Sequence, residues 1–247
     1  MARIVCIAGQ AAGIGKTTTS VHLGVGLAWA GKSTVIVDWD PSRGSALHFG
    51  WNPPQAHAWA VGSQLVDALQ TTASEELRII SGRWELDGAE AVDAWSDAEC
   101  RAAGQRLARE LADFEYVLID CPSALNGFTE SALWAATDVM LPIRCDYGAL
   151  DHVPELVQTV RRMLQTPGKE LDFSGVFLTH YDRDRELAGE LESRVREFFG
   201  EIVFETVIPH DGSFVEAARR GQSIWEWDPR ARGTRAYQEL CMEVLGR

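Results

Sequence analysis

A chain of 247 residues suits an α/β sheet covered by helices on both faces, and its composition, 46% apolar and 24% charged, is that of an average globular protein. This composition excludes disordered, collagen-like and coiled-coil classes, and the net charge of −13 excludes a surface that is basic throughout. Five scattered cysteines, no apolar run of the ~20 residues that a membrane span needs, and no visible secretory signal lead us to expect a cytoplasmic protein with reduced thiols.

Strand-sized apolar runs alternate with amphipathic segments of helical length along the whole chain. In the first half we predict strand 2–8, helix 17–30, strand 33–38, helix 61–70, strand 77–81, helix 98–112 and strand 116–120. In the second half we predict helix 128–136, strand 138–143, helix 151–165, strand 175–179, helix 185–199, strand 205–208 and helix 234–245. Strands this apolar are buried on both faces. We therefore predict one doubly wound, mainly parallel α/β domain spanning residues 1–247, with helices on both faces of the sheet.

A glycine-rich loop lies between the first predicted strand and the first predicted helix. Gly13 and Gly15 let successive backbone N–H groups point inward at an anion, close to the positive end of the helix. Lys16 supplies a positive charge for the β- and γ-phosphates, and the Thr17 hydroxyl can ligate Mg²⁺. The sequence therefore predicts a phosphate-binding loop made of Ala11, Ala12, Gly13, Ile14, Gly15, Lys16, Thr17 and Thr18.

Two other interpretations of this loop are weaker. The strict P-loop pattern has glycine where this chain has Gln10, so an ordinary glycine-rich turn is the plain alternative. A dinucleotide-binding loop requires a third glycine where this chain has Thr18. The run from Gly15 to Thr18, between a strand and a helix, favours the phosphate loop.

Acidic residues follow two of the predicted strands. Asp38 and Asp40 come at the end of strand 33–38, and Asp120 ends strand 116–120. Because the carboxyl ends of parallel strands line one crevice, all three can reach the phosphates, and Asp120 is the expected carboxylate that supports magnesium through water. The plain alternative is that each aspartate caps the helix or turn that follows it.

These residues, in this order, resemble the ParA/Soj/MinD family of deviant Walker ATPases, and specifically its small Soj-like partition proteins. The resemblance extends over residues 4–245. The blocks that carry it are residues 15–19, 37–41, 86–90, 118–123, 141–147 with 149–150, 178–182 and 207–209, then Glu216, Ala217, Gly221, Asp228, Pro229, Gly233, Ala236 and Tyr237. It implies a P-loop NTPase fold with ATP and Mg²⁺ as cofactors.

The resemblance also implies roles for individual residues. Lys16 would hold the phosphates, Thr17 would ligate Mg²⁺ directly, and Thr18 would contact a phosphate oxygen. Asp40 occupies the position that orients the attacking water, so Lys16 and Asp40 are the expected catalytic residues. Asp38 and Asp120 would support magnesium through water. The family encloses the adenine at the positions of Thr179, Pro209, His210 and Asp211.

Members of this family pair face to face around two ATP molecules, bind DNA without sequence preference in that state, and hydrolyse ATP when a ParB-type partner stimulates them. The resemblance thus implies a homodimer, a ParB-like adaptor and double-stranded DNA as partners, and a cytoplasmic, nucleoid-associated location. A basic amphipathic tail of the MinD kind, which binds membranes, is not visible in the last residues, so we expect no membrane contact.

The loop departs from the family pattern. Ala11 stands where the family has a lysine that reaches the partner subunit's phosphates, and Ala12 replaces a glycine. Losing such a cation can cost orders of magnitude in rate. Arg144 stands where the family commonly has a neutral glutamine, and we hypothesise that it partly substitutes for the lysine. An ordinary surface ion pair of Arg144 is the plain alternative.

The DNA-contacting residues depart as well. Soj-like proteins usually have Pro-Arg-Asn followed by another arginine, where this chain has His210, Asp211 and Ser213. A local patch is enough to contact DNA phosphates, although a solvated helix face explains such arginines equally simply. The candidate DNA-binding residues are Arg219, Arg220, Arg230, Arg232 and Arg235.

Three functions follow from this sequence. The first is a ParA-type ATPase of DNA partition, with slow hydrolysis. The alternative is a nucleotide-dependent scaffold that positions cargo other than DNA and hydrolyses little, because Ala11 replaces the lysine. A small-molecule enzyme of the same superfamily, such as an ATP-dependent ligase, is disfavoured by the Soj-like second half of the chain.

Overall fold

The β-branched and apolar runs of the chain form one seven-stranded sheet in the computed structural model, which describes residues 2–51, 65–81, 95–148, 150–151 and 153–247. The sheet order is β3-β4-β2-β5-β1-β6-β7, and every neighbouring pair is parallel except β3 and β4. The strands are β1 (Arg3–Ile7), β2 (Thr34–Asp38), β3 (Leu69–Thr71), β4 (Leu77–Ser81), β5 (Tyr116–Asp120), β6 (Asp138–Arg144) and β7 (Asp172–Thr179). The predicted mainly parallel sheet is confirmed.

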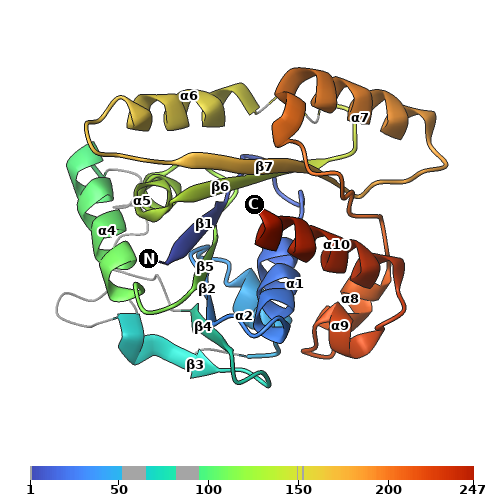
Figure 1. Cartoon of the computed structure of the whole chain (residues 1–247), viewed down its shortest axis with the longest axis horizontal. Coiled ribbons are helices and arrows are strands. Elements are labelled where there is room, and N and C mark those ends of the chain that lie inside the picture. The colour runs from blue at the N-terminus through green and yellow to red at the C-terminus, as the bar shows by residue number, and fades with distance from the viewer. Residues whose placement is uncertain (1, 52–64, 82–94, 149, 152) are drawn as a thin grey trace.

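Helices cover both faces of this sheet (Figure 1). One face carries α4 (Asp97–Glu110), α5 (Gly127–Ala135), α6 (Val153–Leu164) and α7 (Glu186–Phe199). The other carries α1 (Lys16–Trp29), α2 (Gly44–His48), α8 (Ser213–Ala218), α9 (Ile224–Trp227) and α10 (Arg232–Gly246). Side chains of each strand alternate between these two cores: in β1, Ile4 and Cys6 face the first core, and Val5 and Ile7 face the second. The doubly wound architecture is therefore confirmed.

The helix predicted at 61–70 is wrong where the structure describes it, and residues 61–64 lie outside the described residues. Leu65–Ala68 form one turn of 3₁₀ helix, and Leu69–Thr71 form the edge strand β3. The Leu65 N–H donates to the Glu110 carboxylate on α4 (2.6 Å), and Leu69 pairs with Ile80 of β4. Tertiary contacts thus override the local helical spacing.

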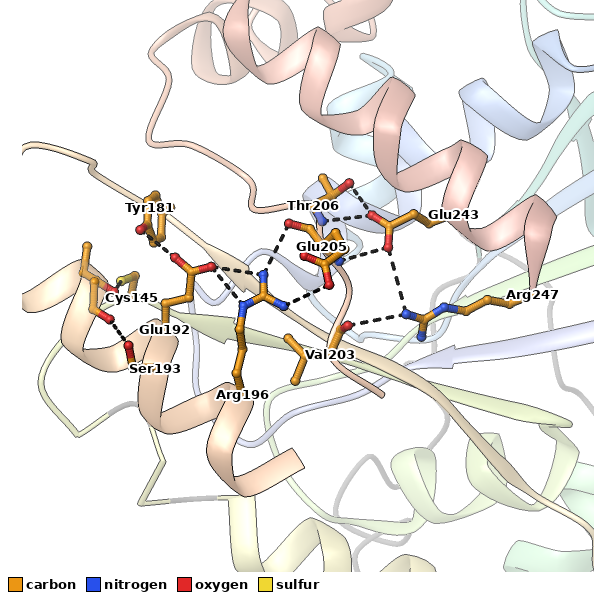
Figure 2. A network of polar contacts seen from close by, with 12 residues as sticks. Cys145, Tyr181, Glu192, Ser193, Arg196, Val203, Glu205, Thr206, Glu243 and Arg247 are labelled. Carbon is orange, nitrogen blue, oxygen red and sulfur yellow. Dashed lines mark hydrogen bonds and ion pairs between the residues drawn. The ribbon is translucent and has the colours of Figure 1, made fainter. Parts of the chain in front are cut away.

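The strand predicted at 205–208 is also wrong. The N–H groups of Glu205 and Thr206 donate to the Glu243 carboxylate of α10 (2.9 Å each) instead of to a neighbouring strand. Figure 2 shows this carboxylate, with the Arg196 guanidinium of α7 on the other side of Glu205. A side chain from each helix therefore holds the start of this segment. Among the residues that the structure describes, only Ile208 of this segment bonds to β7, by donating its N–H to the Leu178 carbonyl (2.8 Å), so no continuous sheet ladder forms.

Three short helices, α2, α8 and α9, have no counterpart in the sequence predictions. Each has four to six residues, which is less than two helical turns and too short for a hydrophobic period to show. Within the described ranges, no helix is long and apolar enough to span a membrane.

Candidate nucleotide site

The loop between β1 and α1 has the backbone conformation of a curled anion-binding turn. Gly13 and Gly15 have φ angles of 70° and 94°, in the left-handed region that side chains avoid, and α1 begins directly after them. The Thr179 hydroxyl at the end of β7 donates to the Ile14 carbonyl (2.8 Å), and Cγ2 of Thr179 lies 3.4 Å from where a Cβ on Gly15 would stand. The loop is thus held from β7, and a larger residue at Gly15 would be strained.

Lys16 joins this loop to the end of β5. Its side chain is buried, with the residue only 6% exposed, and its ammonium donates to the Ala11 carbonyl (3.0 Å) and the Ser123 hydroxyl (2.9 Å). Burial lowers the pKa of Lys16, and the nearby Asp120 carboxylate opposes that shift. A buried cation therefore stands at the mouth of the loop; Ser123, which holds it, had no predicted role.

The two strand-end aspartates lie side by side. Asp38 and Asp120 are register partners on β2 and β5, and both are fully buried. Burial raises the pKa of Asp120 to about 6, although the Ser45 and Thr17 hydroxyls act to lower it. Burial and the Asp120 charge raise the pKa of Asp38 well above its usual range. Two buried carboxylates beside the Thr17 hydroxyl are a set of oxygens that suits a divalent cation.

One oxygen of this pair supports the fit to Mg²⁺ directly. Asp120 Oδ1 is buried and has no hydrogen-bond partner, while Oδ2 accepts from the Ser45 hydroxyl (2.7 Å). A buried carboxylate oxygen left without a donor is costly, and a hydrated cation would supply what it lacks. These residues therefore fit a magnesium site.

The unpredicted helix α2 covers this edge of the sheet. The Ala46 N–H donates to Asp38 Oδ2 (2.9 Å), and Ser45 contacts Asp120 as described above. A Cβ on Gly44 would lie 3.0 Å from the Thr17 side chain, so α2 approaches the start of α1 closely. The plain alternative is thus partly right, because Asp38 does bond to the helix that follows it.

Asp40 lies between these groups and the surface. Asp40 is half-buried. Its carboxylate accepts a hydrogen bond from the Ser42 N–H (2.8 Å), and its backbone carbonyl accepts one from the Arg43 N–H (2.8 Å), so Asp40 begins a turn. Its negative charge acts on both Lys16 and Asp120, so it belongs to the same cluster.

A cavity of about 160 Å³ opens beside the second half of the loop. The four residues predicted to enclose the adenine all line it; their neighbours there include three residues without a predicted site role, His180, Phe214 and Val215. The Asp211 carboxylate accepts from the Ser213 and Gly233 N–H groups (2.9 and 3.0 Å) and so fixes this loop to α10. The cavity lining comprises Gly15, Thr18, Thr179, His180, Ile208, Pro209, His210, Asp211, Phe214, Val215 and Tyr237.

Arg144, the last residue of β6, lies beside the first half of the loop. Its Nε atom forms an ion pair with Asp146 Oδ2 (2.8 Å), and its Nη1 atom lies 3.3 Å from where a Cβ on Gly13 would stand. With Ala11 and Ala12 it lines a second cavity of about 220 Å³. Arg144 thus has the surface ion pair of the plain alternative and also adjoins the loop.

The five candidate DNA-binding arginines form two groups. Arg219 and Arg220 both pair with Glu216, and the Arg220 guanidinium stacks on Trp227 (3.8 Å). The others, Arg230, Arg232 and Arg235, are exposed around the start of α10 and form no ion pair within the described part of the chain, although the Arg232 charge helps to lower the pKa of Asp211. The second group therefore offers the stronger positive charge. The resemblance block at 86–90 and Ala149 lie outside the described residues.

Comparisons with known proteins give matches in both sequence and fold. The AAA_31 family, an AAA domain, matches residues 2–173. The chromosome-partitioning ATPase Soj of Treponema pallidum is 33% identical over 250 residues, covering 100% of this chain and 98% of the relative. The chromosome partitioning protein ParA of Caulobacter vibrioides is 32% identical, covering 99% and 94%. A structure of cobyrinic acid a,c-diamide synthase from Mycobacterium smegmatis, with bound ATP analog and magnesium, superposes with a TM-score of 0.82 at 26% identity, covering 100% and 98%.

Proposed function

The chain belongs to the ParA/Soj/MinD family of ATPases, whose cofactors are ATP and Mg²⁺, and from this premise we propose a cycle of DNA partition. Two copies pair when each binds Mg·ATP, and the pair binds double-stranded DNA without sequence preference. A ParB-like adaptor stimulates slow hydrolysis, which separates the copies. In this proposal residues 1–247 act as one domain in the cytoplasm, associated with the nucleoid and not with a membrane.

The loop and its neighbours carry the chemistry in this proposal. The N–H groups of residues 11–18 and the Lys16 ammonium bind the phosphates, and Thr18 contacts one of their oxygens. Thr17 would hold Mg²⁺ directly, and Asp38 and Asp120 would support it through water; when bound, the ion would neutralise charge on the phosphates. Asp40 orients the attacking water. Thr179, Pro209, His210 and Asp211 enclose the adenine.

One observation carries this proposal: the buried Lys16 ammonium bridges the loop and Ser123, in the segment that follows Asp120, and Oδ1 of Asp120 has no hydrogen-bond partner. A cation and an orphaned carboxylate oxygen both cost free energy when buried. A buried ammonium next to a buried, unpartnered carboxylate oxygen is typical of a site that binds a phosphate and a divalent ion.

Asp40→Ala tests the cycle. With the water-orienting carboxylate removed, Mg·ATP should convert the protein into a long-lived dimer, which light scattering measures, while ATP turnover falls to background. A protein that stays monomeric with ATP bound would contradict the proposal. The wild-type ATPase rate should rise with DNA and adaptor; a flat background rate with intact ATP binding would favour the alternative scaffold for cargo other than DNA.

DNA binding by the dimer has its own test. Of the candidate residues, which include Arg219 and Arg220, we favour Arg230, Arg232 and Arg235. Each of these three that contacts a phosphate contributes about 0.9 to the slope of log affinity against log salt. Arg232→Ala should therefore weaken binding of the ATP-bound dimer and flatten this slope without affecting dimerisation. An unchanged slope in the triple alanine variant would remove these residues from the interface.

A further inference from the structure

We propose that Arg144 contacts the terminal phosphates of the bound nucleotide from beside the loop, and that Asp146 positions its guanidinium for this contact. The inference rests on the nucleotide site proposed above and assigns that site a second cation besides Lys16. Three features carry it: the fixed backbone of Arg144, the orientation of its guanidinium, and the half of the loop that it adjoins.

The backbone at Arg144 is held on the same framework as the loop. Arg144 is the register partner of Thr179, whose hydroxyl bonds to the Ile14 carbonyl of the loop. The next residue, Cys145, donates its N–H to the Thr179 carbonyl (2.9 Å). Arg144 and the loop are therefore braced by the same residue of β7, and their separation is set by the sheet.

The ion pair with Asp146 leaves the donors of Arg144 available. Asp146 contacts Nε, and Nη1 lies against Gly13, so the carboxylate holds the guanidinium by one edge. In the structure as described, neither Nη atom has a hydrogen-bond acceptor. The Arg144 side chain is 44% exposed, and such an ion pair contributes little stability by itself. A guanidinium with free Nη groups has the planar donor pattern that binds phosphate oxygens.

The two cavities divide the loop between them. Gly15 and Thr18 line the cavity of about 160 Å³ that also contains the candidate adenine-binding residues. Ala11 and Ala12 line the cavity of about 220 Å³ that also contains Arg144. The Lys16 ammonium points to the same first half, since it bonds to the Ala11 carbonyl. Arg144 therefore adjoins the end of the loop that lies away from the base, which is where the last phosphate of a triphosphate would lie.

The charges around Arg144 favour an anion there. The pKa of His180 is lowered, by burial first, then by the Arg144 charge and then by His210. His180 is therefore neutral at pH 7, and Arg144 supplies the positive charge on this side of the loop. The opposing charge is Asp146, which is half exposed and screened by solvent. A phosphate in the low-dielectric loop would interact with the guanidinium more strongly than this carboxylate does.

Nucleotide discrimination tests the proposal. Isothermal titration with Mg·ATP and Mg·ADP should show that Arg144→Ala weakens ATP about tenfold and ADP less than about threefold, because only ATP has the terminal phosphate. Arg144→Lys should recover part of the loss. Asp146→Asn should shift ATP affinity in the same direction by a smaller factor, since the guanidinium remains but is no longer held.

Arg162→Ala is the matched control. Arg162 is 51% exposed and pairs with Glu130 at 2.7 Å, but it lies in the last turn of α6 and lines neither cavity. Its alanine variant should bind both nucleotides as the wild type does. Equal losses of ATP and ADP binding in Arg144→Ala, without rescue by lysine, would overturn the proposal in favour of a structural role.

Lys16→Ala separates this inference from the proposed function. If Arg144→Ala binds ATP normally while Lys16→Ala does not, the loop is the nucleotide site and the role of Arg144 is wrong. If Lys16→Ala also binds ATP normally, the nucleotide site itself lies elsewhere and both proposals fail.

Discussion

The two ends of α1 belong to regions built in different ways. At its start, the site is made of the loop, which follows β1, and of Asp38 and Asp120, which are the last residues of β2 and β5. Further along, its side chains meet a layer formed by α8–α10 and by His48 at the end of α2, which we call the C-terminal layer; Ser45 and Ala46 of α2 belong to the site. There the His22 ring contacts His48, Phe214 and Tyr237, each from a different element. The first region is set by the parallel sheet, and the second by contacts between residues far apart in the chain.

Because the two regions differ in this way, we expect residues near the start of α1 to affect mainly the ATPase activity and residues further along to affect mainly the stability of the fold. The site concentrates buried charge, which burial makes costly in the absence of a ligand. The C-terminal layer concentrates apolar area: Trp225 packs on α1 and donates its indole N–H to the His22 carbonyl (3.0 Å). Changes at the start of α1 should therefore impair chemistry, and changes further along should impair folding.

The largest expected effect comes from a substitution that disrupts only the nucleotide site. Lys16→Ala should reduce the ATPase rate by about 100-fold or more, since a preorganised charge on the phosphates is lost. The nucleotide-free protein should keep its stability within about 1 kcal/mol, because the buried ammonium's cost disappears with its two hydrogen bonds. Phosphate release and urea unfolding measure the two quantities.

A large loss of stability in Lys16→Ala would contradict the comparison. It would mean that the bonds to Ala11 and Ser123 hold the loop to β5 as a structural element. Lys16→Met, which keeps most of the aliphatic stem but can form neither bond, should then be about as unstable as Lys16→Ala.

The second prediction breaks the C-terminal layer. A Cβ on Gly26 would lie 2.7 Å from Trp225 Cζ2 and 3.3 Å from Cys241 Sγ, so Gly26→Ala forces α9 and α10 away from α1. We expect a loss of about 1–3 kcal/mol in the free energy of unfolding. The ATPase rate of the folded protein at saturating ATP should change less than about twofold.

Gly189→Ala is the control for this substitution. Gly189 lies within α7 with nothing within 4 Å of the added Cβ, so alanine should stabilise the protein by about 0.5–1 kcal/mol through helix propensity. If Gly26→Ala were equally stabilising in urea unfolding, the packing of α9 on α1 would not have the importance that we assign to it.

The same contrast explains what the sequence could predict. The sheet, the loop and the strand-end aspartates follow from local patterns, because apolar runs, glycines and strand ends are read within a few residues. Ser45 was missed because it lies in a helix of five residues, where a hydrophobic period cannot show. Ser123 was missed because only the fold brings it to Lys16, 107 positions away.

Of the C-terminal layer, the sequence predicted α10, as helix 234–245, but not α8, α9 or the contacts between them. His22 and Trp225 are 203 positions apart, and no spacing marks them as partners. The segment 205–208 has the β-branched composition of a strand, yet Glu243 on α10 takes two of its N–H groups. Long-range polar contacts of this kind override local propensity.

The smallest expected effect is a pH dependence of the free energy of unfolding that arises from His22 in the C-terminal layer. Burial and then the His48 ring lower the pKa of His22 well below its usual range, so the folded protein keeps this ring neutral while the unfolded chain protonates it below about pH 6.5. The unfolded state then binds more protons, and the stability that the neutral ring permits is lost as the pH falls. Between pH 7.5 and 5.5, His22 should account for about 1 kcal/mol of lost stability.

His22→Asn should remove that part of the pH dependence, which urea unfolding at pH 7.5, 6.5 and 5.5 measures. The pKa of His48 is also lowered by burial, so part of the acid loss should remain in this variant. Gly189→Ala, the control used above, changes no titratable group and should leave the slope unchanged. If His22→Asn keeps the full slope, an acidic rearrangement elsewhere destabilises the protein. If it removes the part of the slope assigned to His22 while ATP binding at pH 7.5 is intact, the stability of the C-terminal layer is separable from nucleotide binding, even though Phe214 and Tyr237 contact His22 and also line the cavity beside the loop.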